Sequence, residues 1–122
     1  MLANYNLLYV DDAPRSRDFY ADLFGQKPVE DSETFVLFVL PNGLKFGLWK
    51  NSGVIPAANR PGGFELGLPV DSKDEVDQVA GEWQAKGIEI LQEPQDMDFG
   101  RTFTALDPDG HRLRVFHLDM GQ

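Results

Sequence analysis

The chain has 122 residues with 42% hydrophobic and 11% aromatic content, which suffices for a packed core and excludes a disordered protein. It carries 20 acidic and 11 basic residues, and its net charge of -9 argues against binding to nucleic acid or to anionic membranes. Cysteine is absent, which excludes disulfides, thiolate metal sites and a cysteine nucleophile. The sequence has no signal-like start and no apolar run near the roughly 20 residues that span a bilayer, so the expected location is the cytoplasm.

Residues 1–50 are predicted to form a βαβββ module. An alternating apolar run is followed by a helix that Asp11 or Asp12 caps and Gly25 closes. The sequences ETFVLFVL and LKFGLWK then read as strands joined by a Pro-Asn-Gly hairpin. The helix is amphipathic, and its expected buried face consists of Ser16, Phe19, Tyr20, Leu23 and Phe24.

Residues 63–122 repeat this order of elements, after a predicted linker over 51–62 that is rich in Gly, Pro and Asn. Asp71 or Ser72 caps the second helix, and Gly87 closes it. The sequences RTFTALD and HRLRVFHL follow as strands around the turn DPDG. The helix face that is expected in the core consists of Val76, Val79, Ala80 and Trp83.

Alternation along the strands separates a side that packs on the helix from an open face. In the last strand Leu113 and Val115 are apolar, whereas Arg112 and Arg114 point the other way. The same rule assigns to the open faces Tyr5, Leu7, Tyr9, Lys45, Gly47, Trp49, Glu65, Gly67 and Pro69. This mixture of aromatic, small and charged residues is typical of a concave binding surface.

Trp49 is the main candidate for contact with a ligand. On the face away from the helix and beside Gly47, it would present its ring over an open floor. The alternative is that Trp49 covers an ordinary sheet surface or a subunit contact.

The segment DMDFGRTF is the second candidate and is expected to be a short loop that enters a strand. Met97, Phe99 and Phe103 offer adaptable apolar contact, Gly100 permits close approach of the backbone, and Arg101 offers a planar fork for a carboxylate. The alternative is a loop that packs on its own core.

The tandem plan, with YVDDAPRSRDFYADLFG and ALDPDGHRLRVF, resembles the vicinal oxygen chelate superfamily of glyoxalase I, extradiol dioxygenases and bleomycin resistance proteins. The resemblance covers nearly the whole chain. It implies an α+β fold in which two βαβββ modules form a curved mixed-sheet cleft, in a homodimer. Within the superfamily, LKFGLWK and DMDFGRTFTALDPDGHRLRV look like the phenazine-antibiotic resistance proteins, which bind a flat tricyclic antibiotic without chemistry.

Enzymes of that superfamily hold a divalent metal with four side chains, and the resemblance places those positions at Tyr5, Gly47, Glu65 and Arg114. Tyrosine, glycine and arginine cannot replace imidazoles and carboxylates around a cation, so no metal and no other cofactor is expected. Glu65 and Arg114 are instead predicted to form an ion pair, because they share an open face and carry opposite charges.

The acids and the histidine around the last turn are expected to be structural. Asp107, Asp109 and His111 would build the hairpin turn, with Asp side chains bonding to nearby backbone amides. His117 has the parity of the helix side. No serine has a histidine at a recognisable spacing, and no phosphate-binding or dinucleotide-binding glycine pattern occurs.

These residues and the resemblance together predict reversible, non-catalytic binding of a planar aromatic compound, with phenazine-type antibiotic resistance by sequestration. Trp49 would stack on the ring system, Phe99 and Tyr9 would enclose it, and Arg101 or Arg114 would hold an acidic substituent. The predicted ligand-binding residues are Tyr9, Trp49, Glu65, Met97, Asp98, Phe99, Gly100, Arg101, Phe103 and Arg114, with Asp98 as an acceptor for a ring N–H or hydroxyl group.

Two other functions stay open. One is a metal-dependent lyase or dioxygenase with displaced ligands, and the other is a partner-binding module whose cleft is vestigial. The expected partners are the planar ligand and a second copy of the chain, with no nucleic acid and no membrane.

Overall fold

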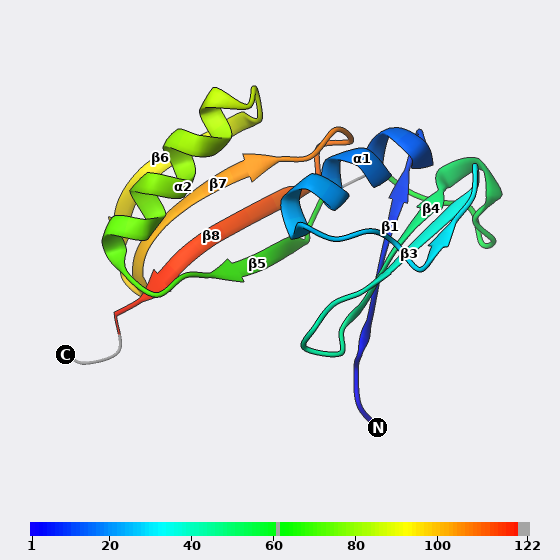
Figure 1. Ribbon diagram of the computed structural model, residues 1–122, viewed down its shortest axis with the longest axis horizontal. Coiled ribbons are helices and arrows are strands. Elements are labelled where there is room, and N and C mark those ends of the chain that lie inside the picture. Colours follow the sequence, from blue (N-terminus) through cyan, green and yellow to red (C-terminus); the bar gives the residue numbers. More distant parts are fainter. Residues whose placement is uncertain (61, 120–122) are drawn as a thin grey trace. The chain divides into compact units, whose positions relative to one another are not determined.

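The computed structural model describes residues 1–60 and 62–119. The chain divides into two compact units, Met1–Arg60 and Pro61–Gln122, and each unit contains one four-stranded mixed sheet and one α-helix (Figure 1). The predicted α+β class and the tandem βαβββ plan are confirmed.

Unit 1 contains β1 (Tyr5–Val10), α1 (Ala13–Phe24), β2 (Glu30–Asp31), β3 (Phe35–Val39) and β4 (Lys45–Lys50), followed by a short 3₁₀ helix, η1 (Asn51–Gly53). The order of strands in the sheet is β1-β4-β3-β2. The pairing of β1 with β4 is parallel and the other pairings are antiparallel. The parallel pair is possible because α1 carries the chain from the end of β1 across the sheet.

Helix α1 begins where the sequence predicts. The Oδ1 of Asp12 accepts a hydrogen bond from the backbone N of Arg15 at 3.1 Å, and Gly25 forms the left-handed C-cap with φ 65°. Tyr20 is fully buried, and its ring centre lies 4.8 Å from that of Phe46 in β4. The helix therefore covers the side of the sheet to which alternation assigns Phe46 and Leu48.

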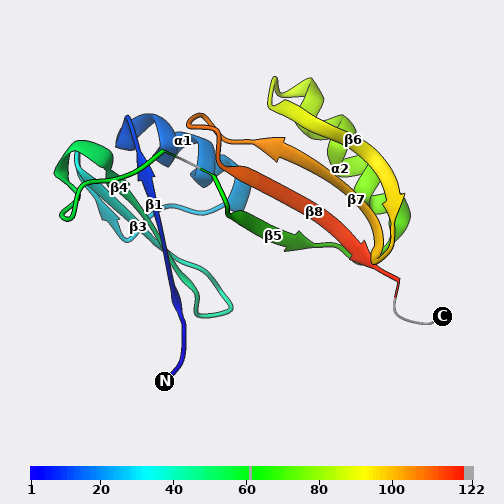
Figure 2. The same ribbon diagram turned by 180° about the vertical axis from the view of Figure 1, so that it is seen from behind.

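Unit 2 contains β5 (Glu65–Pro69), α2 (Lys73–Ala85), β6 (Glu89–Met97), β7 (Gly100–Leu106) and β8 (Arg112–Leu118). The order of strands is β5-β8-β7-β6, again with one parallel pair, β5 with β8. Helix α2 lies along one side of this sheet (Figure 1), and the strands lie in front of it in the reverse view (Figure 2).

Ser72 caps α2 by accepting a hydrogen bond from the backbone N of Glu75 at 3.1 Å. In return, Oε1 of Glu75 accepts from the backbone N of Asp71 at 3.0 Å, in an arrangement close to a capping box. Trp83 is only 8% exposed and meets Phe103 of β7 edge to face, with ring centres 5.3 Å apart. The predicted core position of Trp83 is confirmed.

The segment DMDFGRTF contains a short turn that enters a strand, as predicted, and its first two residues belong to the preceding strand. Met97 ends β6 and Gly100 begins β7, so only Asp98 and Phe99 remain in a tight turn between two antiparallel strands. The long strand β6 pairs with β7 through two register shifts, which allow it to bend along the sheet edge.

Candidate functional site

Each sheet has one side covered by its helix and one open face, as the alternation predicts. On the covered side of unit 1, Phe46 and Leu48 are fully buried. On the covered side of unit 2, Leu113 and Val115 are at most 1% exposed. In each strand, the residues that alternate with these buried ones lie on the open face.

The open face of unit 1 carries a group of aromatic and aliphatic side chains, which we call the aromatic face: Tyr5, Leu7, Tyr9, Phe35 and Trp49. Tyr9 and Trp49 are register partners on β1 and β4, and their rings meet edge to face with centres 6.3 Å apart. Tyr9 remains 39% exposed and Leu7 43% exposed. The prediction that Trp49 lies on the face away from the helix is confirmed.

The floor beside Trp49 is not open, contrary to expectation. A Cβ atom on Gly47 would lie 2.6 Å from Cδ2 of Leu7 and 3.3 Å from the ring of Phe35. A side chain at this position would require Leu7 to shift, because the two neighbouring side chains fold over the glycine. The aromatic face consequently offers rings and methyl groups above Gly47 and not a bare stretch of backbone.

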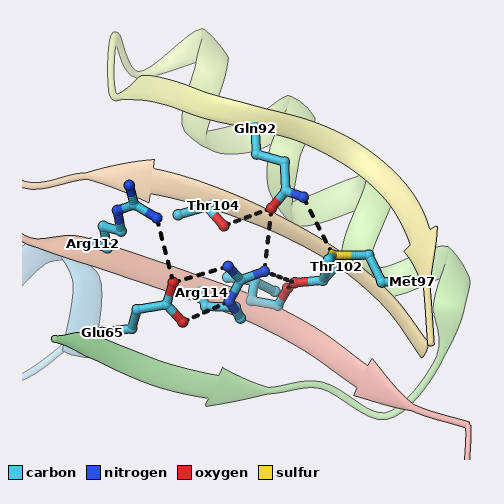
Figure 3. Close-up of polar contacts among 8 residues, drawn as sticks. Glu65, Gln92, Met97, Thr102, Thr104, Arg112 and Arg114 are labelled. Carbon is cyan, nitrogen blue, oxygen red and sulfur yellow. Dashed lines mark hydrogen bonds and ion pairs between the residues drawn. The ribbon is translucent and has the colours of Figure 1, made fainter. Parts of the chain in front are cut away.

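Glu65 and Arg114 form a bidentate ion pair on the open face of unit 2 (Figure 3). The Nε of Arg114 donates to Oε1 of Glu65 at 2.7 Å, and its Nη2 donates to Oε2 at 2.9 Å. The predicted ion pair is confirmed. The two side chains come from β5 and β8, whose parallel register places Arg114 opposite Gly67, one alternation step beyond Glu65.

Two further side chains hold the remaining nitrogen of Arg114 (Figure 3). Its Nη1 donates to Oε1 of Gln92 and to Oγ1 of Thr102, both at 3.2 Å, and Thr104 donates to the same Gln92 oxygen at 2.8 Å. The guanidinium is therefore fixed by residues of three other strands.

Each member of the ion pair stabilises the charged form of the other. The hydrogen bonds from Arg114 lower the pKa of Glu65, although partial burial acts in the opposite direction, and the same bonds raise the pKa of Arg114. Arg112 adds a weaker attraction, with its Nη1 3.9 Å from Oε2 of Glu65. Glu65 thus remains a carboxylate at neutral pH.

A hollow of about 430 Å³ lies beside this ion pair and is the candidate binding site of unit 2. We call it the paired hollow, and its lining residues are Glu65, Phe99, Arg114, Phe116 and Leu118. Most of its wall is apolar, because two phenylalanine rings and a leucine surround the two charged groups. Of the predicted ligand-binding residues, the structure brings Glu65, Phe99 and Arg114 together here.

Arg101 and Phe103 do not lie on this surface, and their predicted place in the binding site is corrected. Both have the parity of the covered side of β7. Phe103 is fully buried against Trp83, and Arg101 donates to Asp77 of α2 at 3.0 Å and to Asp96 of β6 at 3.1 Å. These bonds raise the pKa of Arg101, with Asp77 as the larger cause. Arg101 therefore fastens the helix to the sheet edge.

The other residues of the β6–β7 hairpin are spread around its end. Met97 is exposed, and its sulfur accepts a hydrogen bond from Nε2 of Gln92 at 3.4 Å (Figure 3). Asp98 is exposed in the turn. Gly100 has φ 142°, and a Cβ there would overlap the backbone of His117, so glycine allows close approach of β8 and not of a ligand.

The turn between β7 and β8 is structural, as predicted. The Oδ1 of Asp107 accepts hydrogen bonds from the backbone N of Asp109 at 2.9 Å and of His111 at 2.8 Å. His117 lies on the covered side, with Nδ1 3.2 Å from the carbonyl oxygen of Val70. Neither histidine lines the paired hollow.

Comparison with known proteins agrees with this architecture. The family model of the Glyoxalase/Bleomycin resistance protein/Dioxygenase superfamily matches residues 2–115. The chain belongs to this superfamily. It is 36% identical over 119 residues to the phenazine antibiotic resistance protein EhpR of Enterobacter agglomerans, an alignment that covers 95% of this chain and 92% of EhpR.

Solved structures of the superfamily fold are also similar. A protein of Agrobacterium tumefaciens studied by solution NMR is 48% identical, with a TM-score of 0.90 over 97% of this chain and 98% of that one. A glyoxalase/bleomycin resistance protein/dioxygenase from Nocardioides has a TM-score of 0.83 at 24% identity, over 100% of this chain and 86% of that one, and shows the shared fold alone.

The metal of the superfamily enzymes does not fit the residues present at the positions that the resemblance implies. Gly47 has no side chain, and Leu7 and Phe35 fill the space above it. Both oxygens of Glu65 are engaged by Arg114, whose permanent positive charge opposes a cation. Among residues 1–60 and 62–119, no cluster of three or more His, Cys, Asp or Glu side chains could hold a metal ion.

Sequence reasoning missed several residues of the paired hollow and its support. Phe116 and Leu118 share the parity of Arg114 in β8, so alternation could have found them. Thr102 and Thr104 alternate with Phe103 in β7 and could have been found in the same way. Gln92 had no such signal, because a register shift follows Ile90.

Proposed function

We propose that this protein binds a planar aromatic compound of the phenazine type reversibly and without chemical change, giving antibiotic resistance by sequestration. The observation that carries the proposal is the paired hollow. Phe99, Phe116 and Leu118 provide an apolar wall, and the charges of Glu65 and Arg114 compensate each other beside it. Its volume of about 430 Å³ is within the usual range for sites of small molecules.

The similarity to the phenazine antibiotic resistance protein EhpR supports the choice of ligand. Phenazines are flat tricyclic molecules with two ring nitrogens, so they suit aromatic contacts more than ionic ones. On unit 1 by itself, the aromatic face is a separate candidate surface for such contacts, with Trp49 and Tyr9 as the candidates for stacking.

We propose binding without catalysis because of the side chains at the implied metal positions. An enzyme of the superfamily needs carboxylates and imidazoles around a cation, whereas the implied positions here hold Tyr5, Gly47, an arginine and an arginine-bound carboxylate. Residues 1–60 and 62–119 contain no cluster of three or more His, Cys, Asp or Glu side chains on which the lyase or dioxygenase alternative could rest.

We further propose that the protein acts as a cytoplasmic homodimer. Exposed apolar side chains such as Tyr5 and Leu7 on the aromatic face support association, because contiguous apolar surface often marks an interaction site. No helix in residues 1–60 and 62–119 has the length and apolar character needed to cross a membrane. Sedimentation analysis of the purified chain measures the oligomeric state directly.

The experiment that tests the function is calorimetric titration of EDTA-treated protein with phenazine-1-carboxamide, followed by mass spectrometry of the recovered ligand. We expect saturable binding with the ligand recovered unchanged, and a gain of about 2.7 kcal/mol in the free energy of unfolding at 100 times the dissociation constant. Phe116→Ala should weaken binding, whereas Val29→Ala, at an exposed site in unit 1, should not.

Three results would contradict the proposal. Loss of binding after metal removal would indicate a metal-dependent protein, and conversion of the ligand would indicate an enzyme. No binding of any planar antibiotic would favour a partner-binding module.

A further inference from the structure

We propose that the paired hollow selects uncharged planar aromatic compounds over those that carry a carboxylate, and that Glu65 is the residue that sets this preference. The inference rests on the proposed function, because it defines the class of ligand for the same surface. It replaces the expectation that Arg101 or Arg114 would hold an acidic substituent.

The guanidinium of Arg114 has no complete edge left for a carboxylate. A carboxylate is gripped by two parallel N–H groups on one edge of an arginine. The Nε–Nη2 edge is occupied by Glu65 at 2.7 and 2.9 Å, and on the other edge Nη1 already donates to Gln92 and Thr102. An anionic ligand would have to displace a carboxylate that the protein itself supplies (Figure 3).

The charge of Glu65 opposes such a displacement. Its side chain lines the hollow, so a ligand carboxylate would meet a negative group beside the arginine that it needs. Arg112 is near the pair but is held less closely, at 3.9 Å, and it is not among the residues that line the paired hollow; it lines a second hollow, which Glu65 also borders. The net charge of -9 adds a repulsive background for anions.

Arg114 can instead present its flat side to a ligand. Its side chain is 20% exposed, and its in-plane donors are directed at protein oxygens. A guanidinium in this state stacks on an aromatic ring, which requires no free hydrogen-bond donor. Phe99 and Phe116 line the same hollow and suit the other surfaces of a flat ring system.

The test compares two probes of nearly equal shape, phenazine-1-carboxamide and phenazine-1-carboxylate, by calorimetric titration at pH 7.5. We expect the wild-type chain to bind the carboxamide at least tenfold more tightly. Glu65→Ala opens the Nε–Nη2 edge of Arg114, and Glu65→Gln removes the negative charge while keeping an oxygen. Both variants should improve carboxylate affinity, and Glu65→Ala should do so by at least tenfold.

Glu33→Gln is the matched control, because it removes one negative charge from an exposed turn residue of unit 1 and should leave the ratio of affinities unchanged. Equal or tighter binding of the carboxylate by wild type would overturn the inference, as would no gain in either Glu65 variant when circular dichroism shows both to be folded. If neither probe binds wild type, the proposed function itself fails and this preference fails with it. A preference for the carboxylate with normal carboxamide binding would overturn the preference alone.

Discussion

Trp83 of α2 and Phe103 of β7 meet edge to face with their ring centres 5.3 Å apart and their planes at 81°. Both side chains are buried, so this contact joins the helix to the covered side of the second sheet. A residue in this position contributes to the stability of the unit and has no surface to offer a ligand.

Phe103→Ala is therefore expected to lower the free energy of unfolding by about 3–5 kcal/mol, because it removes a large buried ring and leaves a cavity. Urea denaturation measures this loss. Phe103→Leu should cost less and keep the fold, and its affinity for phenazine-1-carboxamide should equal that of wild type. Weaker binding by a well-folded Phe103→Leu would show that this residue does contribute to the binding site.

The ion pair of Glu65 and Arg114 should make stability depend on acid pH. Because the folded state lowers the pKa of Glu65 below its usual value, the stabilisation is complete above that value and is lost as the pH falls through the folded pKa. Relative to Glu65→Gln, wild type should be more stable by about 1 kcal/mol at pH 7, since the pair is partly exposed, and the difference should shrink as the pH falls below the usual pKa of a glutamate.

Denaturation of both proteins at several pH values between 3 and 7 tests this expectation. Glu33→Gln calibrates the effect of one lost charge at an exposed position. A difference that stays constant or grows as the pH falls would show that Glu65 is not stabilised as a carboxylate.

Gly100→Ala should destabilise unit 2 by more than about 2 kcal/mol. The added Cβ would overlap the carbonyl oxygen of His117, and φ 142° is strained for alanine. Gly81→Ala is the matched control: Gly81 is exposed in α2 and a Cβ there would meet no neighbouring atom within 4 Å, so alanine should stabilise by about 0.5–1 kcal/mol. Thermal denaturation compares the two, and similar melting temperatures would contradict the close approach at Gly100.

Asp107→Ala should cost about 1–3 kcal/mol because the backbone N–H groups of Asp109 and His111 lose their shared acceptor. Asp107→Asn keeps one side-chain oxygen and should cost less. Hydrogen exchange at the two amides provides the direct measurement. Equal protection in wild type and Asp107→Ala would mean that the turn is held by other contacts.

Trp49→Ala should weaken binding of a planar ligand by between about twofold and tenfold if the indole stacks on it, in line with the energy of an aromatic pair. Quenching of tryptophan fluorescence by the ligand should fall in this variant and persist in Phe19→Tyr. Trp83 supplies a constant background signal because it is buried beneath the sheet. Unchanged affinity would assign Trp49 to an ordinary sheet surface or a subunit contact.

The parts of the fold that depend on local signals were predictable from sequence. The cap at Asp12, the stop at Gly25 and the turn around Asp107 each depend on a few consecutive residues. Alternation then placed Glu65 and Arg114 on one face, although 49 positions separate them in the chain. Here a period of two was sufficient, because β5 and β8 are regular and pair without a shift.

The errors arose where a residue's strand or neighbours were not defined locally. Arg101 and Phe103 stand in the predicted strand RTFTALD, but the alternation that places both on the covered side was not applied to them. The filled floor at Gly47 depends on how Leu7 and Phe35 turn their side chains, which no spacing indicates. The contact of Gln92 with Arg114 depends on the register shifts of β6.

The hydrogen bonds around Arg114 also affect the entropy cost of binding a ligand. A free arginine at a binding surface must be immobilised when a ligand arrives, which lowers affinity by about 0.5–1.5 kcal/mol. Here four hydrogen bonds to Glu65, Gln92 and Thr102 restrict the side chain already in the unliganded protein. Binding of a flat molecule would therefore restrict the Arg114 side chain very little further. Most of its conformational entropy is already lost when the protein folds.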